Sequence, residues 1–165
     1  MTEPVNRSAQ LGTALTCAGF LMLFVALFDL MSNAYPFAPG TLEWRYGVTG
    51  MASGFTVTPL TGLVLMIFGA ELAERRGLVK LLGWVCGIAA FLIVISLGLF
   101  LLDGFQMRAA TPDERRTLVG RGVMVAGTKF LLSAVVYALT ARAALRLGAA
   151  EPAAGGDRSP IVGRG

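Results

Sequence analysis

The stretch VKLLGWVCGIAAFLIVISLGLFLL, residues 79–102, decides the fold of this chain. It has one charged residue, Lys80, near its start, and is otherwise almost entirely apolar. A helix needs about 20 predominantly apolar residues to cross the hydrocarbon core of a bilayer. The stretch is long enough, so it predicts a membrane-spanning helix.

Three further apolar runs have a similar length: residues 11–31, 51–71 and 121–146. None carries a polar stripe wide enough for a surface helix of a soluble bundle. Pro59 lies inside the second run and removes one backbone hydrogen bond there, which predicts a kink that membrane helices tolerate. The sequence therefore predicts an all-α integral membrane four-helix bundle.

The four runs also set the domain organisation. Residues 1–10 form a short N-terminal segment on the cytoplasmic side, residues 11–148 the four-helix membrane domain, and residues 149–165 a tail rich in Ala, Gly and Pro that we expect to be disordered. The first run is longer than the 7–15 apolar residues of a secretion signal, and no A-x-A-like site follows it. It is predicted to be a retained membrane anchor.

The composition excludes several classes of function. Hydrophobic residues make up 55% of the chain and charged residues 15%, against about 25% charged in soluble domains. The net charge of +4 comes from residues at the ends of apolar runs, which is typical of membrane flanks and not of a nucleic-acid-binding face. The chain has no histidine, and no metal cluster or phosphate-binding loop is visible. We therefore expect no cofactor, no metal and no nucleic-acid partner.

The two cysteines, Cys17 and Cys86, each lie within an apolar run and have no CxxC spacing. A free cysteine in such surroundings behaves as a small hydrophobic residue. We expect both to be structural.

The basic residues between the apolar runs and at their ends indicate the orientation. With both termini in the cytoplasm, eight of them lie on the cytoplasmic side and five on the other, as the positive-inside rule favours. The eight are Arg7, Arg75, Arg76, Lys80, Arg142, Arg146, Arg158 and Arg164, and the five are Arg45, Arg108, Arg115, Arg116 and Arg121.

The first loop on the extracytoplasmic side is SNAYPFAPGTLEWRYGVTG, residues 32–50. Its prolines and Gly40 end the first helix, and Thr41 is placed to cap a short second helix. Two interpretations remain open: an interfacial helix that guides the chain back into the bilayer, or a patch that docks a partner. The residues concerned are Tyr35, Glu43, Trp44, Arg45 and Tyr46, of which the aromatic ones are typical of the membrane–water boundary.

The fourth helix is predicted to begin at Thr111-Pro112-Asp113-Glu114, ahead of its apolar run. A capping Thr, a Pro at the first helical position and acids in the first turn are typical of a helix start. The helix therefore begins in water before it enters lipid.

Lys129 is the one basic residue well inside an apolar run. A charge at the bilayer centre costs at least about 2.5 kcal/mol, so it needs a partner or a purpose. Asp29 and Asp103 are the candidate partners, snorkelling of the long side chain is a second explanation, and a role in transport is a third.

Small residues at four-residue spacing predict close helix packing. Gly83-x-x-x-Gly87 lies in the third run, and Gly122-x-x-x-Ala126 is a weaker repeat of the pattern in the fourth. An intramolecular contact and dimerisation are both compatible with these motifs.

One family resemblance is carried by three stretches: PFAPGTLEWRYG at 36–47, VTPLTGLVLMIFGAEL at 57–72 and LDGFQMR at 102–108. Together they resemble the membrane region of the HpsJ-like proteins, which are associated in cyanobacteria with hormogonium polysaccharide production. The resemblance covers roughly residues 12–140. It implies a role in the production of a surface polysaccharide.

The sequence as a whole predicts a small, non-enzymatic, multi-pass protein of a bacterial inner membrane. Its expected partners are the lipid bilayer and other membrane proteins of a larger envelope assembly, in which it acts as a subunit or accessory factor, and a homo-oligomer is also compatible. The alternative is a small oligomeric ion- or proton-coupled transporter that uses Lys129. The first and third apolar runs carry almost no polar side chains between their ends, which favours the accessory role.

Overall fold

The computed structural model describes residues 5–149 of the chain, and its regular elements in that range are all helices. They are α1 (Val5–Ala34), α2 (Leu42–Phe55), α3 (Val57–Leu72), α4 (Arg76–Ala110) and α5 (Asp113–Ala149). Because α2 and α3 together form one interrupted stretch, Leu42–Leu72, the described residues contain four stretches long and apolar enough to cross a membrane. The predicted all-α four-helix membrane architecture is confirmed.

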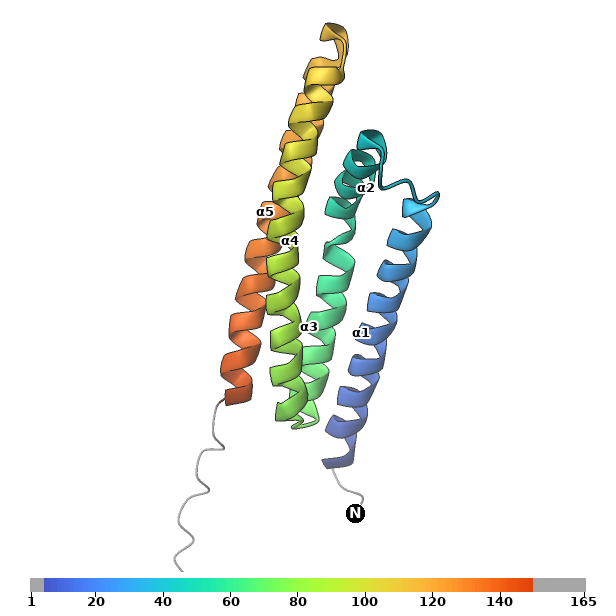
Figure 1. The fold of residues 1–165 in the computed structure, drawn as a ribbon. Coiled ribbons are helices and arrows are strands. Elements are labelled where there is room, and N and C mark those ends of the chain that lie inside the picture. The colour runs from blue at the N-terminus through green and yellow to red at the C-terminus, as the bar shows by residue number, and fades with distance from the viewer. Residues whose placement is uncertain (1–4, 150–165) are drawn as a thin grey trace, which may run out of the picture.

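The helices run up and down in turn (Figure 1). The α1–α2 loop and the α4–α5 turn lie at one end, which we call the loop end. The start of α1, the α3–α4 turn and the end of α5 lie at the other, which we call the terminal end. At the loop end, α4 and α5 project beyond α1 and α2 (Figure 1).

Each of the four membrane-spanning stretches is longer than the apolar run that predicted it, because hydropathy marks only the part of a helix that lies in hydrocarbon. The first helix already begins at Val5, within the predicted N-terminal segment 1–10. The fourth membrane helix begins at Asp113, directly after Pro112, as its start signal predicts. Residues 1–4, and the predicted disordered tail from residue 150 onward, lie outside the described residues.

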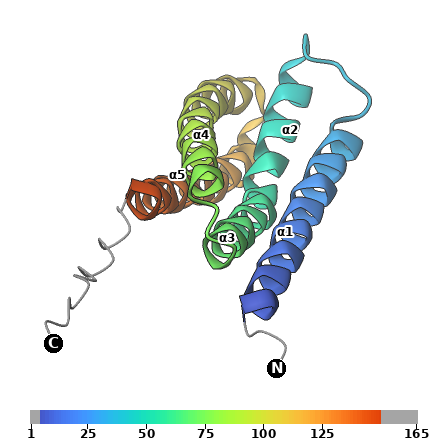
Figure 2. The same cartoon turned by 90° about the horizontal axis from the view of Figure 1, so that it is seen from below.

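The bundle is built from two antiparallel pairs, α1 with α3 and α4 with α5. Figure 2 shows α3 lying between α1 and α4. The first pair meets at glycines: a Cβ added to Gly69 would lie 2.5 Å from the carbonyl oxygen of Gly12, and one added to Gly12 would lie 2.6 Å from that of Gly69. Gly19 and Gly62 meet in the same reciprocal way, seven residues along each helix. The two backbones are therefore in direct contact.

A four-residue spacing does not reveal these four glycines, because they recur at every seventh residue. Their signal is a Gly-x6-Gly repeat in both helices, at 12 and 19 and at 62 and 69. A seven-residue repeat keeps one face of a helix toward its partner over several turns.

The second pair uses the glycines that the sequence did predict. Gly83 on α4 faces Ala144 and Leu145 of α5, and Gly87 faces Ala141. These positions belong to, or adjoin, the larger cluster of buried side chains, which draws on α3, α4 and α5. The GxxxG motif therefore makes an intramolecular contact in the single chain.

The break between α2 and α3 lies at Thr56, three residues before Pro59. Proline has no N–H and its ring displaces the carbonyl four residues earlier, so the hydrogen-bond ladder is weakened here. The Leu60 N–H reaches the Thr56 carbonyl oxygen at 3.4 Å. The neighbouring helix α5 compensates, because the Tyr137 hydroxyl donates to the same oxygen at 3.0 Å. The predicted disturbance of the second span by its proline is thus a helix break, held in place by α5.

Candidate functional site at the loop end

The α1–α2 loop is fastened to α1 by a tryptophan. The indole N–H of Trp44 donates to the carbonyl oxygen of Ala34 at 2.9 Å, which satisfies one acceptor left free at the end of α1. The Phe37 ring lies against Trp44, with centroids 6.2 Å apart. The Trp44 side chain therefore closes the loop onto the helix that precedes it.

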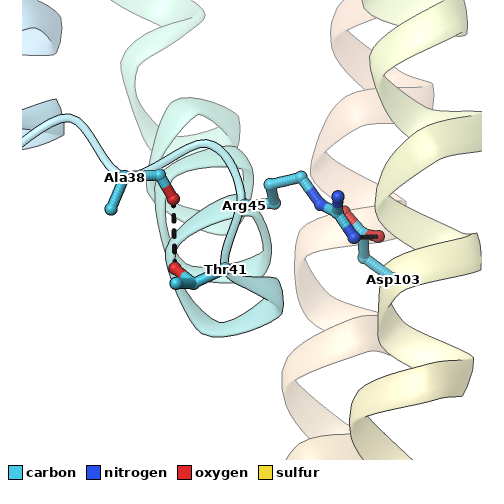
Figure 3. Close-up of polar contacts among 4 residues, drawn as sticks. All are labelled: Ala38, Thr41, Arg45 and Asp103. Atoms are coloured by element: carbon cyan, nitrogen blue, oxygen red, sulfur yellow. Dashed lines mark hydrogen bonds and ion pairs between the residues drawn. The ribbon is translucent and has the colours of Figure 1, made fainter.

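Thr41 stands at the N-cap position of α2, as predicted, but its hydroxyl does not accept a helix N–H. It donates instead to the carbonyl oxygen of Ala38 at 3.0 Å (Figure 3). The Thr111 hydroxyl behaves similarly before α5, because α4 continues to Ala110 and leaves the Met107 carbonyl in reach at 2.6 Å. Both threonines bond backward along the chain.

Arg45 of α2 forms an ion pair with Asp103 of α4 (Figure 3). The guanidinium Nη2 lies 3.3 Å from the carboxylate Oδ1. The Arg45 side chain is 44% exposed and that of Asp103 is 14% exposed. This contact links the two helix pairs at the loop end.

The predicted pairing of Lys129 is not formed among the described residues. Asp103 forms its ion pair with Arg45 of α2, and Asp29 is exposed on α1. Lys129 is itself exposed on α5, one residue before the buried Phe130. Neighbouring residues of a helix lie about 100° apart, so the burial of Phe130 turns Lys129 toward the surrounding lipid. That leaves snorkelling as the way for its ammonium group to reach water.

Tyr46 lies inside the bundle at the loop end. Its ring stacks on Phe100 of α4 with centroids 5.1 Å apart, and Phe100 in turn contacts Phe130 of α5 at 5.9 Å. Gly122 leaves room for the Tyr46 hydroxyl, which reaches the Val119 carbonyl oxygen at 3.4 Å. Three helices thus meet in one aromatic cluster.

The second small-residue motif contributes to this same aromatic cluster. Gly122 admits the Tyr46 hydroxyl, and Ala126 is buried beside Phe100 and Phe130. Within the single chain, Gly122 lies beside a side chain of α2, and Ala126 lies in the buried cluster.

The five residues of the predicted loop patch have different roles. Trp44 and Tyr46 are engaged within the chain, and Arg45 bridges to α4. Tyr35 and Glu43 are exposed, Tyr35 by 76%. The short helix predicted in this loop is α2. It does not end at the membrane–water boundary but continues to Phe55 and forms the first part of the second span.

Three arginines and two acids surround the α4–α5 turn at the tip of the projecting pair: Arg108, Arg115, Arg116, Asp113 and Glu114. Arg121 lies about two turns further along α5. The Arg116 side chain holds the turn, because its Nε donates to the Thr111 carbonyl at 3.1 Å and its Nη1 pairs with Asp113 at 2.5 Å. The three arginines at the tip are exposed. They give the tip a positive surface that suits an anionic partner.

Among residues 5–149, no group of three His, Cys, Asp or Glu side chains lies close enough to hold a metal ion. Comparison with known proteins found no matching family model, no matching curated protein and no matching solved structure. The resemblance to the HpsJ-like proteins stays a prediction from the sequence.

Proposed function

We propose that this chain is a non-catalytic accessory subunit of a larger membrane assembly in the envelope of a bacterium. Its role is to present the projecting α4–α5 turn to a partner while the rest of the bundle stays in lipid. The resemblance of its loop and second span to the HpsJ-like proteins makes the production of a surface polysaccharide the process we favour.

The observation that carries this proposal is the projection of α4 and α5 past α1 and α2 (Figure 1). Helix α4 continues from Asp103 to Ala110 beyond the ion pair with Arg45, a rise of about 10 Å at 1.5 Å per residue. One headgroup layer is only about 5–7 Å thick. The turn therefore reaches past the headgroups into water when the ion pair lies at the hydrocarbon boundary.

The charge of the tip favours a partner with an acidic surface. Two long, exposed cations, Arg108 and Arg115, lie on different helices of the turn. Exposed charges at the rim of an interface act mainly on the rate of encounter and on orientation. We expect association to weaken as the salt concentration rises.

Site-specific crosslinking in intact cells tests the proposal. A photo-crosslinking amino acid replaces Arg115 at the tip, and the same amino acid at Arg142, which is exposed near the terminal end, is the matched control. We expect a discrete crosslinked membrane or envelope protein from position 115 and not from position 142. Equal products from both positions, or none from position 115, would refute the role of the tip.

We propose further that the protein lies in the inner membrane with both termini in the cytoplasm, which puts the loop end outside. The support is the eight-to-five distribution of basic residues. Reporter fusions after Arg76 and Gly148 should then read cytoplasmic, and fusions near Gly40 and Thr111 extracytoplasmic. The opposite pattern would place the tip in the cytoplasm.

The transporter alternative requires Lys129 to line a path for an ion. Lys129 is exposed on the outside of α5 in the single chain, so such a path would lie between copies. A crosslinked homo-oligomer with Lys129 at its interface would favour this alternative over the accessory role.

A further inference from the structure

An apolar groove opens on the side of the bundle between α1 and α4, whose backbones do not approach each other closely. Its volume is about 610 Å³. One wall is formed by α1, where it includes Phe20 and Leu27, and the other by α4, where it includes Leu92 and Ser96. The break between α2 and α3 forms the floor, together with Tyr137 of α5.

The dimensions of the groove decide what can occupy it. Its α1 wall runs from Phe20 to Leu30, about 15 Å at 1.5 Å per residue, which is about half of the ~30 Å that a transmembrane helix crosses. A hydrocarbon chain at van der Waals separation needs a channel only about 4–5 Å wide. The groove is long and wide enough to hold part of a lipid chain.

The chemistry of the walls also suits a hydrocarbon chain. The lining is almost entirely aliphatic and aromatic. The two hydroxyls of the floor are already satisfied inside the protein, because Tyr137 donates to the Thr56 carbonyl and the Thr56 hydroxyl bonds to that of Ser133 at 2.7 Å. The floor therefore makes no polar demand on an occupant.

A charged pair lies above the groove at the loop end. Asp103 follows Ser96 by seven residues on α4, and Arg45 precedes Ala52, a lining residue, by seven on α2. Residues seven apart share a helix face, so both charged groups lie in line with the groove, about 10 Å beyond it. Arg45 uses one of its five N–H donors on Asp103 and is 44% exposed, which leaves donors for an anion.

We propose that the groove binds an acyl chain of a membrane phospholipid whose phosphate lies against Arg45. Arg45 lies about 10 Å along the helix axis from Ala52, the nearest groove residue of α2, and one headgroup layer of about 5–7 Å together with the long Arg45 side chain spans this distance. The guanidinium group supplies charge-assisted hydrogen bonds to the phosphate. The bound lipid fills the space between the two helix pairs.

Native mass spectrometry of the full chain, purified in mild detergent, tests this. The probes are phosphatidylglycerol and a diacylglycerol with the same two chains, which lacks the phosphate. We expect the chain to retain phosphatidylglycerol about tenfold better, as a hydrogen bond to a charged group allows. Arg45→Gln should remove this preference, and Arg108→Gln, which changes another exposed arginine at the loop end, should keep it.

A second pair of variants tests the groove itself. Leu92→Trp places a large ring in the groove from a wall residue that is 54% exposed, so the core is not strained. The matched control is Leu99→Trp, on the same helix and 57% exposed but outside the groove. We expect Leu92→Trp to lower the retention of phosphatidylglycerol about fivefold and the control to leave it unchanged, with equal melting temperatures.

Three results would overturn the proposal. Equal retention of phosphatidylglycerol and diacylglycerol would show that the protein does not recognise the phosphate. Equal retention by Leu92→Trp and Leu99→Trp would show that the lipid binds elsewhere. A loss of dimers in Leu92→Trp without a loss of lipid would make a second copy of the chain the occupant.

Discussion

The contact between α1 and α3 offers a sharp test of how this bundle is held together. The change is Gly69→Ala, which adds a single methyl group. In the structure that methyl would lie 2.5 Å from the carbonyl oxygen of Gly12 and 2.8 Å from the backbone nitrogen of Thr16. Both atoms belong to the backbone of α1, so no side-chain rotation can relieve the clash.

The size of the effect follows from this geometry. An ordinary contact of a Cβ begins at 3.4 Å, so α1 must move away by about 0.6–0.9 Å. A gap of about 0.5–1 Å forfeits a quarter to a half of the dispersion energy between the facing atoms. Lipid is as apolar as leucine, so dispersion is the main force that joins these helices. With the usual penalty for overpacking, we expect a loss of about 1–3 kcal/mol in the free energy of unfolding.

The matched control is Gly98→Ala on α4, where an added methyl group meets nothing within 4 Å. Alanine is favoured over glycine in a helix by up to about 1 kcal/mol, so this variant should be neutral or slightly stabilised. Reversible unfolding of the purified chain in mixed micelles, followed by circular dichroism, compares the two variants. The double variant Gly12→Ala/Gly69→Ala should lose less than the sum of its parts, because both methyls open the same contact.

A stability of Gly69→Ala equal to that of Gly98→Ala would refute the close backbone contact of α1 and α3. Full additivity in the double variant would show that Gly12 and Gly69 do not share one contact.

Three further predictions concern charged and sulfur-containing side chains. In double-mutant cycles on the unfolding free energy, Arg45 and Asp103 should couple by about 0.2–1 kcal/mol, as expected for a partly exposed pair. Lys129 and Asp103 should show no coupling. Recovery of stability when the charges of Lys129 and Asp103 are exchanged would contradict the structure. The Lys129→Met variant should insert and unfold like the native chain, because the substitution only removes a lipid-facing charge. A clear loss of stability would show that Lys129 has a buried partner. A lipid-soluble maleimide should label the exposed Cys17 much faster than the buried Cys86, while a membrane-impermeant reagent labels neither; equal labelling by the soluble reagent would contradict the packing of α4.

The structure separates the two cysteines that the sequence treats alike. Both lie in apolar runs, but Cys86 is fully buried among α3, α4 and α5, whereas Cys17 faces outward from α1. In a membrane protein an apolar position can face either lipid or protein, so the composition of a run does not distinguish the two cases.

The sequence alone determined the four spans and their order. Long apolar runs must become helices in a bilayer, because each backbone polar group has to find its partner inside the segment. Local signals were also sufficient for the disturbance at Pro59, for the start of α5 after Pro112 and for the close packing at Gly83. These features depend on residues within about one turn of each other.

The tertiary structure alone decided which helices pair and which charges meet. The sequence proposed Lys129 as a partner of Asp103, and the structure places Arg45 there instead. It also brings Gly12 against Gly69, and leaves a groove between α1 and α4. Each of these contacts depends on how a helix is rotated about its own axis, where one residue changes the direction of a side chain by about 100°. An apolar run is nearly uniform around that axis, so only the packing of the helices against one another sets the rotation.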